Sequence, residues 1–440
     1  MVAPSLSSRG RVHVGAPIRI DMEATFEAGE NLYDPETNPT GAFPLNVAEN
    51  KLGLAELKTH LRQRISETEI PDWVAGYTAM LGAPDVRQTI ATFLERYLTG
   101  CPIDSELLGF SAGASSAIEM TAFILADPGD VAVFPVPSYP VYAKDVGNFG
   151  GMERYDLHTY DSFDALAREP MLTIQHLEDT LADLESQGKR FRMLVVTNPN
   201  NPTGGLYPEH VVRAAATWCI EHEIHMVVNE IYGLSRIDTS HPAIRDDYAL
   251  DIAYSSFVPI MDEMASDYLH FWYAFSKDFG VSGFRFGMVY SLNRDFISAY
   301  NNLNLAHTVS NMAQWSMQLL LEDYAFLDEY LPRVRKRLTE SYVVVVEHLR
   351  QNGVPYVPSR GGLFVWVDLG AFVCEDTREA ENELWLELYQ ATGILLTPGS
   401  GFGHRGYGQF RMVYPYVRKP ALEVAMQRLA EFVTNKRKES

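Results

Sequence analysis

The sequence predicts an α/β fold with two parts: a large domain on a mostly parallel sheet and a smaller α+β domain. Short apolar blocks alternate with helical stretches between residues 61 and 320, and long amphipathic helical sequence follows. The 440 residues are also too many for one simple core. We therefore expect an N-terminal arm over 1–60 that joins the small domain, a large domain over 61–320 and a C-terminal small domain over 321–440.

The predicted strands of the large domain are apolar, rich in β-branched residues and bounded by turn residues, as in a buried parallel sheet. They cover residues 131–135, 193–197, 225–229 and 286–291. A helical pattern at 208–222 separates two of them. This alternation requires crossover connections, which build a layered α/β architecture.

The sequence changes character after about residue 320. Residues 312–352 form a long amphipathic helical pattern, in which Pro332 predicts a break or restart. Two strand-like segments follow at 362–370 and 409–415, and a last helix is expected over 420–436. A cofactor site is expected in the cleft between the two domains.

Composition excludes several classes of protein. The net charge of -21 argues against binding to nucleic acid, which requires clustered Lys and Arg. Cys101, Cys219 and Cys374 form neither a disulfide framework nor a CxxC metal pair, so we expect reduced, mostly buried thiols and no metal. Because the N-terminus lacks a signal-peptide core and no apolar run reaches roughly 18 residues, a cytoplasmic protein without a membrane segment is expected.

Two segments are candidates for binding an anion and a polar ligand. SAGASSAIE (111–119) is a small, glycine-containing turn that opens a helix, where free backbone N–H groups and the helix dipole favour phosphate. TNPNNPTGG (197–205) follows a predicted strand and combines prolines, glycines and three asparagine amides in one turn. Taken alone, the first is an ordinary helix start and the second a Pro/Asn turn.

Two further segments carry chemistry. VVNEIYG (227–233) ends a strand with Asn229 and Tyr232, at a usual ligand position of open α/β sheets. FSKDFGVSGFRFG (275–287) holds Lys277 and Arg285 in a run punctuated by glycines. An enzyme of pyridoxal 5′-phosphate (PLP) needs such a pair, because the lysine binds the cofactor aldehyde and the arginine grips its phosphate.

Together these ordered motifs resemble the fold-type I PLP enzymes of the class I/II aminotransferase family, from about residue 45 to 415. Within that family the chain is similar to 1-aminocyclopropane-1-carboxylate (ACC) synthases, through VAENKL (47–52), ILADPGDVAVFPVPSYP (124–140) and GGLFVWVDL (361–369). The resemblance implies PLP as cofactor, an aspartate-aminotransferase-like fold with a three-layer α/β/α large domain, an amino-acid substrate and a homodimer with shared active sites.

The resemblance also implies roles for single residues. Lys277 would hold PLP as a Schiff base and move protons. The ring would stack on Tyr139, and Asn201 and Tyr232 would hydrogen-bond its hydroxyl. Arg411 would pair with the substrate α-carboxylate, a contact that a forked guanidinium makes well. The phosphate would be bound by Gly113, Ala114, Ser115, Ser276 and Arg285, and the substrate side would be lined by Ala48 and Glu49.

Three positions depart from the family pattern, and each touches the cofactor. Asn229 stands where the family has an aspartate that supports a protonated pyridine nitrogen, so the ring is expected to be a poorer electron sink. Met80 stands where the family has a tyrosine that reaches the neighbouring subunit's phosphate. Ala274 replaces a serine three residues before Lys277. Compensating contacts, altered chemistry or weak PLP retention would explain these changes.

The expected reaction is removal of the Cα proton from an L-amino acid, followed by elimination, replacement or cyclisation at a side-chain (γ) leaving group. S-adenosylmethionine is the first substrate to test. Ordinary transamination with a 2-oxoacid acceptor is the alternative, and a PLP-binding protein with little turnover is a further one.

Overall fold

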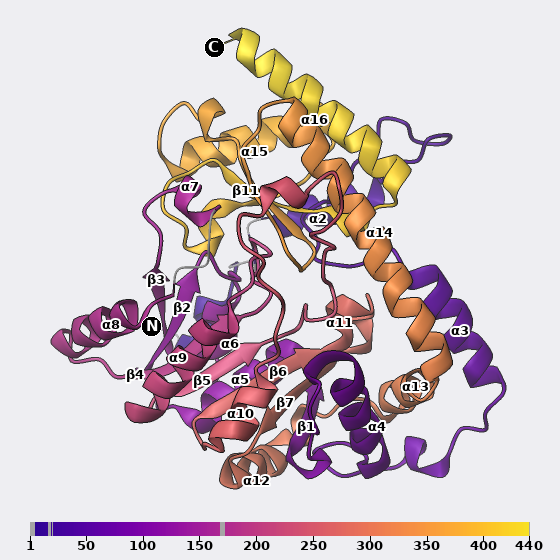
Figure 1. Ribbon diagram of the computed structural model, residues 1–440, viewed down its shortest axis with the longest axis vertical. Helices are drawn as coiled ribbons and strands as arrows, with labels where there is room; N and C mark the ends of the chain where they lie inside the picture. Colours follow the sequence, from indigo (N-terminus) through magenta and orange to yellow (C-terminus); the bar gives the residue numbers. More distant parts are fainter. Residues whose placement is uncertain (1–4, 16–18, 20, 168–171, 440) are drawn as a thin grey trace.

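The large sheet has seven strands, all from the middle part of the sequence. The computed structural model describes residues 5–15, 19, 21–167 and 172–439. The strand order is β1-β7-β6-β5-β4-β2-β3, and all strands except β7 run parallel to one another (Figure 1). The strands are β1(Leu108–Ala112), β2(Val131–Val136), β3(Glu153–His158), β4(Phe191–Thr197), β5(His225–Asn229), β6(Leu269–Ala274) and β7(Phe286–Ser291).

This sheet confirms the α/β class and the mostly parallel arrangement. The segment 286–291 is a strand as predicted, but it does not belong to the parallel set, because β7 pairs antiparallel with both β1 and β6. The connection from β6 to β7 contains only α11(Phe275–Asp278) and a 3-10 turn. A parallel pairing would need a longer crossover connection, so the chain turns back instead.

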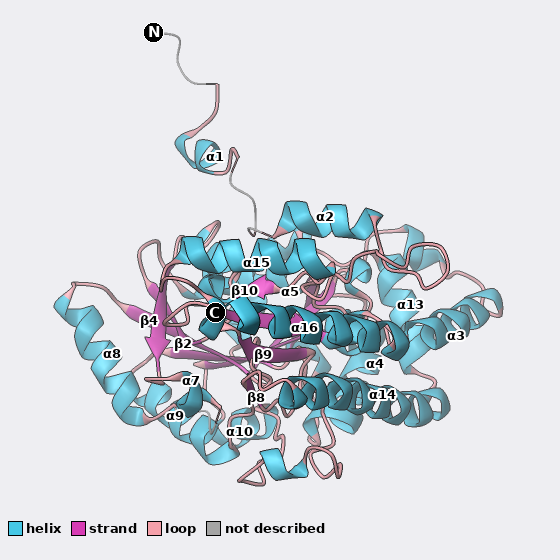
Figure 2. Cartoon of the chain, turned by 90° about the horizontal axis from the view of Figure 1, so that it is seen from above, coloured by secondary structure: helices cyan, strands magenta, loops and turns pink. Residues whose placement is uncertain are grey.

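Helices cover both faces of the large sheet. On one face, α5(Ala114–Leu125) packs against β1, β6, β7 and α6(Tyr142–Gly147). On the other face, α8(Ile174–Ser186), α9(Glu209–Glu221) and α10(Val258–Met264) lie beside β4, β5 and β6 (Figure 2). The carboxyl ends of β4 and β5 therefore open at one edge of a three-layer unit.

The smaller sheet is antiparallel, with strand order β10-β11-β9-β8. Its strands are β8(Tyr356–Val357), β9(Phe364–Asp368), β10(Thr397–Pro398) and β11(Gln409–Val413), and its helices are α14(Tyr324–Gln351), α15(Arg378–Thr392) and α16(Lys419–Glu439). The predicted break at Pro332 is wrong, because α14 continues through it. The helical pattern breaks earlier, at Glu322 and Asp323, where the Asp323 side chain caps α14 by accepting a hydrogen bond from the Phe326 N–H (3.0 Å).

Each sheet lies in its own apolar core, and α14 joins the two. Leu327 and Tyr330 pack in the large-sheet core, whereas Tyr342 and Val345 pack in the small-sheet core. The N-terminal segment contributes Phe43 to the small-sheet core. The division at residues 60 and 320 stays a prediction.

The remaining described helices complete the structure: α1(Ser8–Val12), α2(Met22–Glu30), α3(Leu54–Ser66), α4(Pro84–Leu94), α7(Phe163–Leu166), α12(Arg294–Leu303) and α13(Asn311–Leu321). None of the described helices is both long and apolar enough to cross a bilayer. The three cysteines are free, but only Cys219 is buried, and Cys374 is exposed, which corrects the expectation of mostly buried thiols.

Candidate active site

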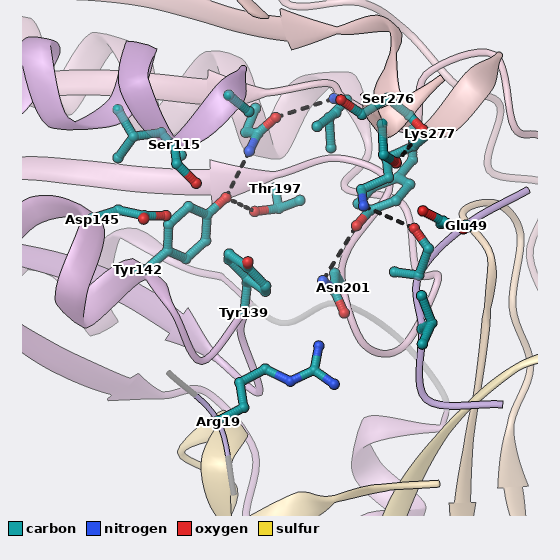
Figure 3. Close-up of a pocket in the computed structure, with 18 of the residues that line it drawn as sticks. Arg19, Glu49, Ser115, Tyr139, Tyr142, Asp145, Thr197, Asn201, Ser276 and Lys277 are labelled. Carbon is teal, nitrogen blue, oxygen red and sulfur yellow. Dashed lines mark hydrogen bonds between the residues drawn. The ribbon is translucent and has the colours of Figure 1, made fainter. Parts of the chain in front are cut away.

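A cavity of about 250 Å³ opens where the carboxyl ends of β4 and β5 meet the loop at 47–49, the start of α5 and strand β11. Figure 3 shows Lys277 and Glu49 on one side of it, and Ser115, Tyr142 and Asp145 on the other. All of the predicted site residues except Gly113 line this cavity, and they come from seven separate segments of sequence: Ala48, Glu49, Ala114, Ser115, Tyr139, Asn201, Asn229, Tyr232, Ser276, Lys277, Arg285 and Arg411.

Lys277 lies in α11, directly after β6, and its Nζ donates a hydrogen bond to the Ala48 carbonyl (2.8 Å). Burial, assisted by the charge of Arg411, lowers the pKa of Lys277 to about 8. A lysine that releases its proton near neutral pH can attack a carbonyl and can afterwards act as a base. The amine is therefore suited to the two tasks predicted for it.

The start of α5 forms an anion cradle together with Arg285. Gly113 precedes the helix with a φ of 93°, and a Cβ built on it would lie 2.3 Å from Arg285 Nη2. Gly113 therefore lies beneath the arginine and lets it approach, rather than lining the cavity. The first backbone N–H groups of α5 have no preceding helical turn whose carbonyl groups could accept their hydrogen bonds. They are therefore available to a phosphate.

Asn229 takes part in a neutral hydrogen-bond network. Its Nδ2 donates to the Tyr142 hydroxyl (2.8 Å), which is also 2.8 Å from Thr197 Oγ1, and its Oδ1 accepts from the Ile231 N–H (3.1 Å). Burial raises the pKa of Tyr142 to about 12, so this hydroxyl stays protonated. The network offers donors and acceptors to a ligand ring but no negative charge.

Arg411 is buried on β11 and points into the cavity. Its Nη1 donates to Asn201 Oδ1 (3.0 Å), and its Nη2 donates to the Asn46 carbonyl (2.8 Å). Its Nε has no partner among the described residues. Burial lowers the pKa of Arg411 to about 10, so it remains charged at neutral pH. A buried guanidinium with an unused donor is a ready site for a carboxylate.

Three further acidic or aromatic groups complete the walls. The Tyr139 ring meets Tyr142 edge-on, with centroids 5.3 Å apart. Burial and the charge of Glu119 raise the pKa of Asp145 to about 7, and its Oδ2 has no partner in the described part of the chain. Glu49 lies 3.8 Å from Lys51 Nζ. The cavity thus combines aromatic faces with polar groups of both signs.

This set of groups fits PLP. The cradle at α5 and Arg285 suits its phosphate, Lys277 suits its aldehyde, and Tyr139 offers an aromatic face to its ring.

Sequence comparison assigns the family. The profile of aminotransferase class I and II matches residues 43–429. The chain belongs to this family. Family members use PLP, and we conclude that the protein is a PLP-dependent enzyme.

The relatives of this PLP-dependent enzyme include ACC synthases, as the motifs predicted. It is 28% identical over 419 residues to ACC synthase 7 of Arabidopsis thaliana (93% of this chain, 91% of the relative). It is 30% identical to the ACC synthase of Glycine max (92% and 83%). It is 29% identical to ACC synthase-like protein 1 of Mus musculus (97% and 82%).

Solved structures confirm the aspartate-aminotransferase-like fold. The aspartate aminotransferase of Thermus thermophilus with maleate superimposes with a TM-score of 0.77 at 20% identity, covering 98% of this chain and all of that one. An archaeal alanine:glyoxylate aminotransferase gives a TM-score of 0.80 at 17% identity, covering 98% of each chain.

Sequence reasoning missed five polar residues of the cavity: Arg19, Tyr142, Asp145, Thr197 and Ser282. Tyr142 and Asp145 had a signal, because they follow Tyr139 closely and are three residues apart, which places their side chains on one face of a helix. Arg19 had no such signal, since the arm that carries it is far in sequence from every motif.

Proposed function

We propose that this enzyme removes the Cα proton of an L-α-amino acid and then eliminates, replaces or cyclises at a leaving group on the γ-carbon. When bound, PLP supplies an electron-withdrawing system that stabilises negative charge at Cα. In this proposal Arg411 binds the α-carboxylate, Arg285 and the start of α5 hold the phosphate, and Lys277 takes the Cα proton.

The neutral environment of Asn229 is the observation that carries the proposal. Asn229 gives its amide hydrogen to Tyr142 and offers no charge to a protonated pyridine nitrogen. Charge released from Cα is then less well stabilised than beside an aspartate. A γ leaving group gives that charge an exit directly when Cα displaces it and closes a three-membered ring, whereas elimination or replacement at the γ-carbon also needs a proton removed from Cβ. Transamination gives the charge no such exit.

The test is an assay for leaving-group release. S-adenosylmethionine is offered alone and with candidate nucleophiles, and methylthioadenosine is measured by mass spectrometry. Amino acids with acylated or phosphorylated side-chain hydroxyls are offered in parallel, and the acid released is measured. Lys277→Ala is the control, and its turnover is expected to fall at least about a hundredfold because the base is lost.

Transamination with a 2-oxoacid is the second candidate, supported by the intact set of Lys277, Arg285 and Arg411. Each amino acid is therefore also incubated with 2-oxoglutarate. Stoichiometric glutamate formation without leaving-group release would overturn the elimination proposal in favour of an aminotransferase.

A further inference from the structure

The cavity contains one cation that the proposed function does not use. Arg19 lines the cavity beside Tyr139, and its guanidinium turns into the open space (Figure 3). Its side chain is 18% exposed. Its charge contributes to lowering the pKa values of both Lys277 and Arg411, which places it within electrostatic reach of both.

Arg19 is fixed along one edge only. Its Nε donates to Asp21 Oδ1 (2.8 Å), and its Nη2 donates to Asp21 Oδ2. Burial opposes ionisation of Asp21, but the hydrogen bonds and charge of Arg19 outweigh it and hold the pKa of Asp21 below its usual value. A guanidinium has five N–H donors, and among the described residues Nη1 of Arg19 has no hydrogen-bond partner.

The same framework holds Arg411. Asn46 Nδ2 donates to Asp21 Oδ2 (2.6 Å), and the Asn46 carbonyl accepts from Arg411 Nη2 (2.8 Å). Asp21 and Asn46 are both fully buried. The guanidinium groups of Arg19 and Arg411 are thus held by Asp21 and Asn46, which are hydrogen-bonded to each other, and both guanidinium groups reach the same cavity. The distance between the two groups is therefore set by buried, hydrogen-bonded residues.

We propose that Arg19 binds a second carboxylate of the substrate, at the end of the side chain remote from the α-carboxylate. This inference rests on the proposed function, because it takes Arg411 as the α-carboxylate site. Arg285 faces the phosphate cradle, which leaves Arg19 as the remaining forked cation of the described cavity wall. A guanidinium fork matches a carboxylate through two parallel hydrogen bonds.

The substrate class follows from this charge. A lyase of this kind would act on an amino acid whose leaving group carries a carboxylate, and an aminotransferase would use a dicarboxylic acceptor. The cationic sulfonium of S-adenosylmethionine is disfavoured beside Arg19, so the preferred substrates in the assay above are amino acids whose side-chain hydroxyl is acylated by a dicarboxylic acid.

The test measures binding, not turnover. PLP-loaded protein is titrated calorimetrically with glutarate and with pentanoate, which share a five-carbon chain but carry two carboxylates and one. We expect glutarate to bind at least about tenfold more tightly, as expected for a charged hydrogen-bonded pair. Equal affinity for the two acids would overturn the proposal.

Variants assign the preference to Arg19. Arg19→Gln is expected to remove the preference for glutarate while pentanoate affinity stays within about twofold, and Arg19→Lys, which keeps the charge without the fork, is expected to retain part of it. Arg9→Gln, an exposed arginine of the same arm, is the matched control and should bind both acids as the wild type does. Circular dichroism and cofactor absorbance check that each variant is folded and loaded. A preference that survives in Arg19→Gln would refute the role of Arg19.

The outcome is separable from that of the proposed function. A glutarate preference lost in Arg19→Gln would support the second carboxylate site even if no leaving group were ever released. Leaving-group release by a protein without that preference would support the reaction and reject the site.

Discussion

At the scale of single residues, Arg411 illustrates how a charge is retained in a buried position. The residue is only 1% exposed, and its guanidinium has hydrogen bonds to Asn201, Asn46 and Thr397. It also lies over the rings of Phe364 (4.9 Å) and Phe402 (5.2 Å). Aromatic faces attract a cation without competing for its N–H groups. The arginine therefore stays positioned while its Nε remains available to a ligand.

Replacing Arg411 by lysine tests this position. Arg411→Lys keeps the positive charge but loses the planar fork, and Asn201 and Thr397 lose a donor. We expect kcat/KM to fall about thirtyfold, equivalent to about 2 kcal/mol of lost charged hydrogen bonding, with PLP still bound. Steady-state kinetics and cofactor absorbance measure the two effects. Arg418→Lys, at an exposed position, is the control, and unchanged kinetics in Arg411→Lys would remove Arg411 from the substrate site.

Asn229 links the protonation of the predicted pyridine nitrogen to the reaction that the enzyme catalyses. Asn229→Asp replaces a donor to Tyr142 by an acceptor and adds a carboxylate facing the predicted pyridine nitrogen. We expect the cofactor absorbance to become less dependent on pH around neutrality, because the carboxylate favours the protonated ring. Products are expected to shift towards transamination. Spectra and products that are indifferent to the change would mean that Asn229 does not face the ring nitrogen.

At the scale of elements, the start of α5 shows why a glycine is required before a phosphate cradle. Gly113 has a positive φ, and its missing side chain leaves room for Arg285. Gly287 on β7 is similarly constrained, because a Cβ there would lie 2.4 Å from the Gly113 carbonyl carbon. The helix start, β7 and the arginine can therefore approach one another only through glycines.

Gly113→Ala is predicted to weaken cofactor binding, because the added Cβ would displace Arg285. We expect the Kd for PLP to rise at least about tenfold, the loss of roughly one charged hydrogen bond. Gly129→Ala is a matched control, because Gly129 has nearly the same φ (94°) but open space around the added Cβ. Both variants carry the backbone strain, and only Gly113→Ala should lose PLP in equilibrium dialysis. Equal losses would attribute the effect to strain alone.

The strands and helices also show which features of the fold can be predicted from the sequence. Apolar blocks at 131–135, 193–197 and 225–229 were sufficient to predict three parallel strands, because a strand buried on both faces has a continuous apolar sequence. The direction of β7 was not predictable in this way, since burial is the same for both directions. Pro332 misled because its cost within α14 is outweighed by packing along the helix, which no local rule contains.

The sequence was sufficient to predict the site residues that lie in family motifs, but not all of the residues that line the cavity. Lys277, Arg285 and Arg411 belong to recognisable patterns, and all three line the cavity. Arg19 lies in an otherwise ordinary segment, and only tertiary packing brings it to the cavity. Rules that use only local sequence carry no information about which residues far apart in the chain come together in the fold.

At the scale of the whole molecule, the resemblance implies a homodimer in which each subunit completes its neighbour's site. Met80 stands where the family places the tyrosine that crosses to the neighbouring phosphate. Tyr77, three residues before it, is 94% exposed in the single chain. We expect sedimentation to give twice the mass of 49.5 kDa, independent of PLP. A monomer at micromolar concentration would contradict the shared site.

Restoring the tyrosine tests whether the site is shared. Met80→Tyr is expected to tighten PLP binding about threefold to tenfold, since one phenol hydrogen bond to phosphate is added.

The design that separates subunits is a mixed dimer, in which one chain carries both Lys277→Ala and Met80→Tyr and the other is wild type at both positions. Only the wild-type lysine can fix PLP on reduction with borohydride, so tighter retention at Lys277 of the unmutated chain would show that the phenol acts across the interface. Met312→Tyr, at an exposed methionine, is the control and should leave retention unchanged. Tighter retention only when Met80→Tyr and Lys277 share one chain would place position 80 in its own subunit's site and reject the crossed arrangement.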